Sequence, residues 1–154
     1  MSSRQKFIVR CRGIILHEGK LLVVRHAHDP SFAALPGGHL EWGEDAHTCI
    51  RREIFEELGI EPVIGRLLYV NTFHATRDGE TVQPFEFFFE VTNGDAYLAY
   101  EDSVRSHAHE LAEVSWISPE DEVHLLPEEV MRDFKAGQIL SDTPRYINSL
   151  PQTN

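Results

Sequence analysis

Cysteine is scarce in this chain, and positive charge is in deficit. Two cysteines, Cys11 and Cys49, stand among 154 residues, which is too few for a disulfide framework, and they lack CxxC spacing. We therefore expect both to be small core residues of a protein in a reducing compartment, the cytoplasm. Lys and Arg number 14 against 25 Asp and Glu, a formal net charge of −11. This balance argues against long nucleic acid as a ligand, because binders of nucleic acid carry a basic surface.

Long hydrophobic runs are also missing. No stretch approaches the roughly 18 consecutive apolar residues of a membrane span, and residues 1–10, MSSRQKFIVR, lack the apolar segment of a signal peptide. We expect no membrane association. An apolar content of 42% with 10% aromatics is enough for the core of one domain. We assign residues 1–154 to that domain, with a core of about 6–137 and a tail, 138–154, of little pattern.

The predicted elements alternate between strands and helices. Residues 7–16 and 20–25 form a hairpin around Gly19, and a loop rich in Pro, Gly and His covers 26–43. A helix is expected from about Glu44 to Leu58, with Glu44 and Asp45 in its first turn and Gly59 at its end. Further strands are predicted at 66–73, 85–91 and 111–117, and a short helix between Pro127 and Gly137. This order predicts an α+β fold in which helices flank a mixed β-sheet.

The helix at 44–58 carries acids where apolar residues are expected. Its buried stripe is marked by Ala46, Cys49, Ile50, Ile54 and Leu58. Glu53 and Glu57 lie inside that stripe, and Glu56 lies at its edge. Grouped carboxylates repel one another and are costly to desolvate, so they call for a cation, and hard oxygen ligands suit Mg²⁺ or Mn²⁺. The alternative is that these acids are solvated or paired with Arg51 and Arg52.

The loop before this helix favours a ligand site. Leu35-Pro36-Gly37-Gly38 combines a rigid turn with two residues that lack Cβ, so its backbone can approach a metal or phosphate closely. Gly38, five residues, Glu44, seven residues and then the run REIFEELGI at 52–60 match every position of the Nudix box, Gx5Ex7REUxEExGU, in which U is a bulky aliphatic residue. The chain therefore resembles the Nudix hydrolase family.

The resemblance implies an α/β/α sandwich with a loop–helix–loop site for a diphosphate and a divalent cation. Family hydrolases cleave a nucleoside diphosphate linked to another moiety by attack of water on phosphorus. Carried over, Glu53, Glu56, Glu57 and the Gly38 carbonyl are expected metal ligands, with Mg²⁺ or Mn²⁺ as cofactor. The expected catalytic residues are Glu53, Glu57, the supporting Glu44 and Arg52, and Glu110. Glu53 and Glu110 share the prediction of general base.

Several residues outside the helix are candidates for substrate binding. They are Arg12 and Arg25 as phosphate contacts, Gly37, His39 and Glu41 around the glycine loop, and Glu86. Glu86 alternates against Phe85, Phe87 and Phe89 and either enters the substrate cleft or lies on a solvated face. Phe32, Trp42, Phe73 and Phe88 are candidate base-stacking residues, although aromatic residues are more often core.

Other functions remain open from the residues alone. The pairs His26/His28 and His107/His109 could hold zinc, contact substrate or be solvent-exposed. The chain could instead be a non-catalytic Nudix module that senses a nucleotide or binds a protein. The expected partner is a small nucleotide or nucleotide sugar, and no subgroup marker follows the box. A homodimer using the 85–89 strand is also expected, the alternative being that this strand is core.

Overall fold

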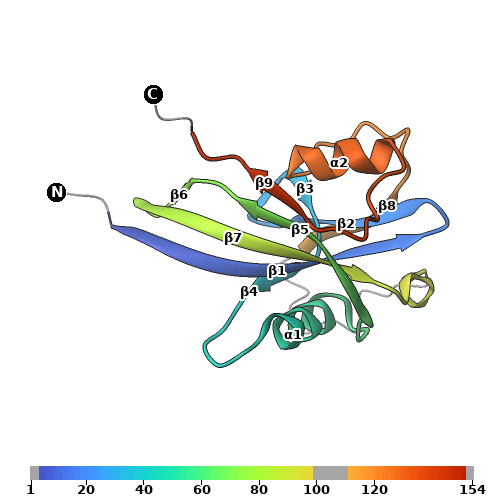
Figure 1. Ribbon diagram of the computed structural model, residues 1–154, viewed down its shortest axis with the longest axis horizontal. Coiled ribbons are helices and arrows are strands. Elements are labelled where there is room, and N and C mark those ends of the chain that lie inside the picture. The colour runs from blue at the N-terminus through green and yellow to red at the C-terminus, as the bar shows by residue number, and fades with distance from the viewer. Residues whose placement is uncertain (1–3, 99–110, 152–154) are drawn as a thin grey trace.

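The computed structural model describes residues 4–98 and 111–151. Their elements, in chain order, are β1 (Gln5–His17), β2 (Lys20–His26), β3 (Asp29–Ala34), β4 (Gly37–His39), α1 (Ala46–Leu58), β5 (Ile64–Thr72), β6 (Ala75–Arg77), β7 (Glu80–Val91), the 3₁₀ turn η1 (Gly94–Tyr97), β8 (Leu111–Ile117), α2 (Glu128–Lys135) and β9 (Arg145–Asn148). Figure 1 shows α1 and α2 on opposite sides of the strands. The fold is thus an α+β sandwich around a mixed sheet, as predicted.

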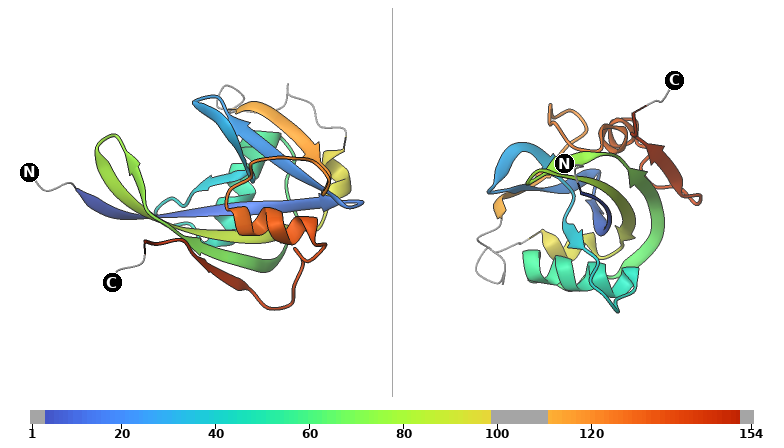
Figure 2. Two further views of the ribbon diagram at one scale, coloured as in Figure 1. Left: turned by 90° about the horizontal axis from the view of Figure 1, so that it is seen from above. Right: turned by 90° about the vertical axis from the view of Figure 1, so that its left-hand side faces the viewer.

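The long strand β1 connects the two parts of the sheet. Along the main path the strand order is β3-β2-β1-β7-β5-β9, with β4 paired to β1, β6 to β7 and β8 to β2. The β1–β7 and β5–β9 pairs are parallel, and the others are antiparallel. β1 pairs with β4 through Arg10–Arg12 and with β2 through Leu16 and His17. Figure 2 shows the strongly curved sheet that results, with α1 and α2 outside it.

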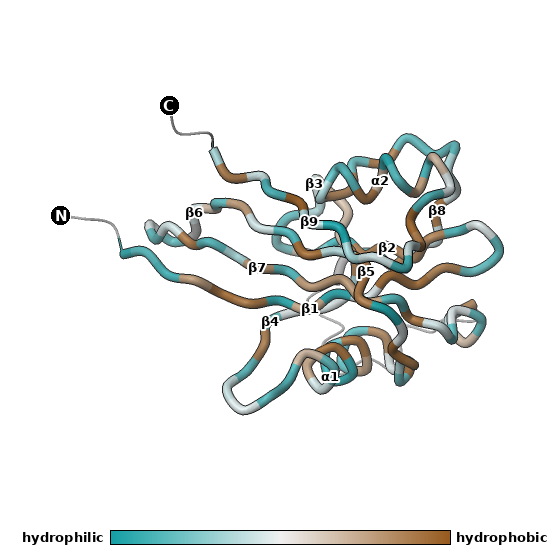
Figure 3. Tube along the Cα trace, viewed as in Figure 1, coloured by the Kyte–Doolittle hydropathy of each residue, from teal (hydrophilic) through white to brown (hydrophobic). Residues whose placement is uncertain are grey.

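The core lies on both faces of the sheet because alternate residues of a strand point to opposite sides. Ile14, Tyr69 and Phe88 pack beneath α2, together with Phe134 of that helix. On the other face, Ile15 and Phe89 pack with buried residues of α1. Figure 3 shows hydrophobic residues recurring along the strands in the middle of the molecule. Cys11 and Cys49 are free and buried in the α1-side core, as predicted.

Predictions about the helix, the loop 26–43 and the strand 85–91 need correction, and that strand begins earlier than expected, as β7 at Glu80. The helix begins at Ala46, because the Asp45 side chain accepts a hydrogen bond from Thr48 N (2.8 Å) as N-cap. Glu44 and Asp45 therefore precede the first turn. The expected loop 26–43 contains β3 and β4. β4 pairs with β1, which is distant in sequence, so local propensity does not reveal it, whereas β3 forms a hairpin with the preceding strand β2.

The tail beyond Gly137 contains β9, which pairs with β5 from Tyr69–Arg145 to Thr72–Asn148. Ile139 and Ile147 are buried in the α2-side core. The tail therefore completes one edge of the sheet. None of the helices in the part of the chain that the structure describes is long and apolar enough to cross a membrane.

Candidate active site

Two glycines bring the loop before α1 into contact with that helix and with β1. A Cβ on Gly38 would lie 2.5 Å from the carboxyl carbon of Glu53, and a Cβ on Gly37 would lie 2.1 Å from the Cys11 carbonyl oxygen. Gly37 also has a φ of 146°, a conformation that side-chain-bearing residues rarely adopt. The Gly37 amide donates to Glu57 Oε2 (3.3 Å). The glycine pair thus places bare backbone against two carboxylates of the helix.

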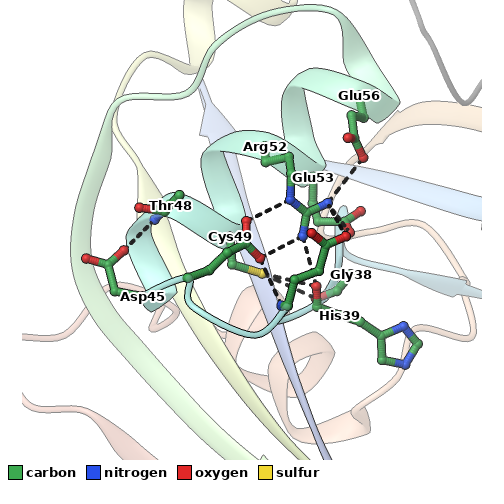
Figure 4. A network of polar contacts seen from close by, with 10 residues as sticks. Gly38, His39, Asp45, Thr48, Cys49, Arg52, Glu53 and Glu56 are labelled. Carbon is green, nitrogen blue, oxygen red and sulfur yellow. Dashed lines mark hydrogen bonds and ion pairs between the residues drawn. The ribbon is translucent and has the colours of Figure 1, made fainter.

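Arg52 organises the acids on the solvent side of this loop (Figure 4). Its Nε donates to Glu44 Oε2 (2.7 Å), and its Nη1 donates to Glu53 Oε1 (2.8 Å) and to Glu56 Oε2 (3.3 Å). Its Nη2 donates to the His39 carbonyl oxygen (3.0 Å). The hydrogen bond from Arg52 is the main reason why the pKa of Glu44 lies below its ordinary value. Arg52 therefore ties the glycine loop to α1.

The expected metal ligands lie together at this junction. Glu57 is only 4% exposed, which confirms that an acid occupies the covered side of the helix. Glu53 and Glu56 pair with Arg52, so the alternative of arginine pairing holds for these two. Among the described residues, no three His, Cys, Asp or Glu side chains already converge into a metal-binding group.

The donor set nevertheless fits a hard divalent cation. Glu44, Glu53 and Glu56 surround one guanidinium, and Glu57 adds a fourth carboxylate nearby, so negative charge remains in excess. The absence of a side chain at Gly38 leaves its backbone directly against the Glu53 carboxylate. Carboxylate and carbonyl oxygens are the ligands that Mg²⁺ and Mn²⁺ prefer.

A second charged group, Arg12 with Glu86, lies on the α2 side of the sheet. Arg12 Nε donates to Glu86 Oε2 (2.8 Å), and Arg12 Nη1 donates to the Leu35 carbonyl oxygen (2.9 Å) at the entry to the glycine loop. Burial opposes the charge of Glu86, but Arg12, Arg10 and the Asn71 hydrogen bond together outweigh it and hold the pKa of Glu86 below its ordinary value. Glu86 is 4% exposed, so the solvated alternative for this residue is wrong.

A cavity of about 390 Å³ opens beside this ion pair. Its walls include Arg12 and Glu86, the rings of Phe32 and Phe73, and Asn71. The first turn of α2, with Glu128 and Glu129, closes another side. A cavity of this size, apolar with a few polar groups, is typical of a small-molecule site. Arg12 also donates to the Leu35 carbonyl oxygen, so this one side chain links the cavity to the glycine loop.

Some lining residues were not predicted from the sequence. Arg10, Asn71, Ser149 and residues 126–129 come from four distant segments. Arg10 lies two residues from Arg12, and Asn71 lies two residues from Phe73. Residues two apart in a strand point to the same face, so this spacing is the signal that points to Arg10 and Asn71. Nothing in the sequence links residues 126–129 and Ser149 to the site.

The other aromatic candidates and Arg25 lie elsewhere. Phe88 is fully buried and packs edge-on against Tyr69, and Trp42 is fully exposed. Arg25 donates to the Pro30 carbonyl oxygen (3.2 Å) and pairs with Glu113 (3.6 Å) on the neighbouring strand. Arg25 is not among the residues that line the cavity.

The remaining candidates lie around the glycine loop or outside the described residues. The His39 ring points away from Arg52 in Figure 4, and Glu41 is exposed with its carboxylate 3.8 Å from Arg52. The rings of His26 and His28 are 5.5 Å apart. Glu110 and the pair His107/His109 fall within 99–110, outside the described residues.

Comparison with known proteins agrees with this geometry. The family model described as NUDIX domain matches residues 8–137. The chain is 40% identical over 85 residues to an ADP-ribose pyrophosphatase of Methanocaldococcus jannaschii, covering 54% of this chain and 50% of that protein. It is 39% identical over 67 residues to a MutT-like protein of Streptomyces ambofaciens, covering 42% of this chain and 43% of the relative. The chain thus spans half or less of the length of these curated relatives.

Solved structures share the fold. The chain superposes on the solution structure of the E. coli ORF135 protein with a TM-score of 0.55 and 23% identity, covering 86% of this chain and 89% of the other. An ADP-ribose pyrophosphatase from Streptococcus suis gives a TM-score of 0.61 with 16% identity, covering 90% and 98%. At these identities the likeness establishes the architecture alone.

Proposed function

Because the chain belongs to the NUDIX domain family, we propose that it is a Mg²⁺-dependent pyrophosphohydrolase. Its substrate would be a nucleoside diphosphate linked to another moiety, cleaved by attack of water on phosphorus. The observation that carries the proposal is the contact of the Gly37-Gly38 backbone with the carboxylates of Glu57 and Glu53. Arg12 links the entry of the glycine loop to the cavity of about 390 Å³.

Glu53, Glu56, Glu57 and the Gly38 carbonyl would hold the cation. When bound, a divalent ion neutralises charge on the phosphate oxygens and makes water a better nucleophile. Arg52 keeps Glu44 and the glycine loop in place through its hydrogen bonds. Arg12, fixed by Glu86, presents positive charge between the cavity and the loop. The general base would be Glu53 or Glu110, either of which must reach the attacking water.

The activity test compares the unaltered chain with Glu57→Gln. Both are incubated with Mg²⁺ and a panel of ADP-ribose, nucleotide sugars, dinucleoside polyphosphates and nucleoside triphosphates, and the products are identified by chromatography. We expect turnover of at least one substrate and a loss on the order of 10²-fold or more in Glu57→Gln, as for removal of a group that stabilises developing charge. Glu120→Gln, at an exposed position outside the site, is the matched control. Equal rates in the two chains would exclude this mechanism.

ADP-ribose comes first in the panel because two curated relatives are named as ADP-ribose pyrophosphatases, one of them as putative. That activity is the one named for those relatives, of which this chain spans half or less. A modified nucleoside triphosphate is the second candidate, because the chain is also similar to a MutT-like protein. The identity of the cleaved products, a monophosphate pair or a monophosphate with pyrophosphate, distinguishes the two.

Removal of the metal gives an independent check. Dialysis against a chelator should abolish turnover, because four clustered carboxylates repel a phosphate chain unless a cation lies between them. Adding back Mg²⁺ should restore the rate, and Mn²⁺ is the second metal to test. Full activity after chelation, with residual metal excluded by elemental analysis, would contradict the proposal.

A further inference from the structure

The α2-side face of the sheet changes from apolar to polar where the cavity begins. Tyr69 of β5 lies opposite Phe88 of β7, and both belong to the core beneath α2. Two residues further along, Asn71 lies opposite Glu86, and both line the cavity. Tyr69 and Asn71 share a face of β5 because strand residues alternate, and Phe73, just beyond the end of β5, also lines the cavity. The cavity floor therefore continues the core face, with an amide at the position that follows Tyr69.

The Asn71 side chain is buried, and of its two polar atoms only the nitrogen makes a hydrogen bond within the described residues. Asn71 is 3% exposed. Its Nδ2 donates to Glu86 Oε1 (3.3 Å). Its Oδ1 has no hydrogen-bond partner among residues 4–98 and 111–151. A buried acceptor without a donor is costly, and in a cavity wall it marks a place where a ligand donor fits.

Glu86 determines the orientation of this amide. The Glu86 carboxylate is held ionised by Arg12, so it can only accept hydrogen bonds. The NH₂ group of Asn71 must therefore face Glu86, which leaves the carbonyl oxygen as the group available to a ligand. Arg10 Nη1 lies 3.8 Å from the same carboxylate, so Glu86 is surrounded by donors on three sides. The contacts of Arg12 with Glu86 and of Glu86 with Asn71 thus fix Asn71 Oδ1 as a hydrogen-bond acceptor in the cavity wall.

We propose that Asn71 Oδ1 accepts a hydrogen bond from an N–H group on the edge of the substrate's nucleobase, which makes Asn71 a specificity-determining residue. The rings of Phe32 and Phe73 in the cavity wall supply the apolar contact that a flat heteroaromatic base requires. The inference rests on the proposed function, since it seats the nucleoside in the cavity and the phosphates toward Arg12 and the glycine loop. The N–H comes either from an exocyclic amine or from a ring nitrogen.

Binding of non-hydrolysable diphosphates tests this assignment. The probes are α,β-methylene diphosphates of adenosine, inosine and purine riboside, whose bases carry an exocyclic amine, a ring N–H, and neither. The pyrimidine counterparts are those of cytidine, uridine and pyrimidin-2-one riboside. Affinities are measured by calorimetry with Mg²⁺ for the unaltered chain, Asn71→Leu and Asn71→Ala. Leu keeps the fork at Cγ but carries no polar group and is larger than Asn, so Ala is the second variant, which leaves room if Leu obstructs the cavity.

In the unaltered chain, one N–H-bearing base of a series should bind about tenfold or more tightly than the base without N–H, as expected when a buried acceptor gains or lacks its donor. The base that binds most tightly shows whether the exocyclic amine or the ring nitrogen is the donor. In both variants, the two bases should bind with affinities that differ by no more than about twofold. The base without N–H should bind as it does to the unaltered chain. Thermal unfolding of each variant checks that it is folded.

Two results would overturn the assignment: equal affinities within both series in the unaltered chain, or a ratio that survives in Asn71→Ala. Turnover of hydrolysable substrates is scored separately. Selective binding without any turnover would refute the proposed hydrolase function, but base recognition by Asn71 would stand. Turnover with equal affinities would support the hydrolase function and refute base recognition by Asn71.

Discussion

At the scale of single residues, the site depends on charged groups that the fold removes from water. Glu86 and Arg12 are largely buried, with side chains 6% and 14% exposed, and their Oε2–Nε distance is 2.8 Å. Removing one member of such a pair leaves the other as an uncompensated buried charge. The pair is therefore expected to contribute to stability as well as to the shape of the cavity.

Glu86→Gln should lower the free energy of unfolding at pH 7 by about 3 kcal/mol, because Arg12 loses its counter-charge. The pKa of Glu86 is depressed in the folded chain. Its contribution is therefore complete above the ordinary carboxyl pKa, about 4.3, and is lost as the pH falls through the lower folded value. Urea titrations at pH 7 and at about pH 3 should show a difference between the two chains that shrinks in acid. A difference independent of pH would contradict this prediction.

The neighbouring glycines should respond differently to alanine. At Gly38 the added Cβ meets the movable end of Glu53, so Gly38→Ala should fold but lose much of the Mg²⁺-dependent activity. At Gly37 the Cβ meets backbone atoms of Cys11 and Arg12 at 2.1–2.9 Å, so Gly37→Ala should be strongly destabilised. Thermal unfolding and turnover measured on both variants separate the two effects. Full activity in a folded Gly38→Ala would show that the close approach of Gly38 to Glu53 is not needed for catalysis.

At the scale of elements, α1 is held at both ends by local interactions. Asp45 caps its N-terminus through Thr48 N, and Gly59, with a φ of 74°, ends it while donating its N–H to the Phe55 carbonyl oxygen. These caps set where Glu53, Glu56 and Glu57 point, because each residue advances the helix by about 100°. The position of the acids thus follows from where the helix begins.

Asp45→Ala should destabilise the chain by about 1 kcal/mol, the usual cost of losing an N-cap. For a protein of this size that corresponds to a decrease in Tm of about 2–4 °C. Differential scanning calorimetry measures it, and Glu122→Ala, at an exposed position away from α1, provides the comparison. Equal Tm values for the two variants would show that the cap contributes nothing.

At the scale of the whole molecule, the C-terminal segment is part of the core. β9 extends the sheet beyond β5, and Arg145 donates to Asp133 Oδ2 of α2 (3.1 Å). Ile147 is buried beneath α2, whereas the adjacent Tyr146 is 63% exposed. The segment therefore links β5 to α2, which forms one side of the cavity.

Ile147→Ala should cost about 2–4 kcal/mol of unfolding free energy, because it leaves a space in a packed core. Tyr146→Ala, one residue earlier on the solvent side of the same strand, should cost much less. Denaturant unfolding of both variants tests this alternation directly. Equal costs would mean that β9 does not pack as described.

The homodimer expected from the sequence stays a prediction, which light scattering at micromolar concentration can test.

The sequence by itself determined the helix, its acids and the glycine loop, because these lie close together in the chain and the helix obeys its periodicity. Residues 35–60 carry the caps, the buried stripe and the match to the Nudix box in one continuous segment. The sequence also located most of the strands, since alternation within β1, β7 and β8 is a local pattern. Periodicity placed Glu57 on the covered side of α1, where the structure has it.

Only the tertiary structure decided the cavity, β4 and β9, and the partners of each charge. Asn71 and Glu86 are opposite each other because β5 and β7 pair in one register, and no local signal specifies that register. Residues 126–129 and Ser149 reach the same cavity only when α2 and the C-terminal segment pack on the sheet. Long-range pairing thus supplied the cavity, and the local sequence supplied the acids of α1.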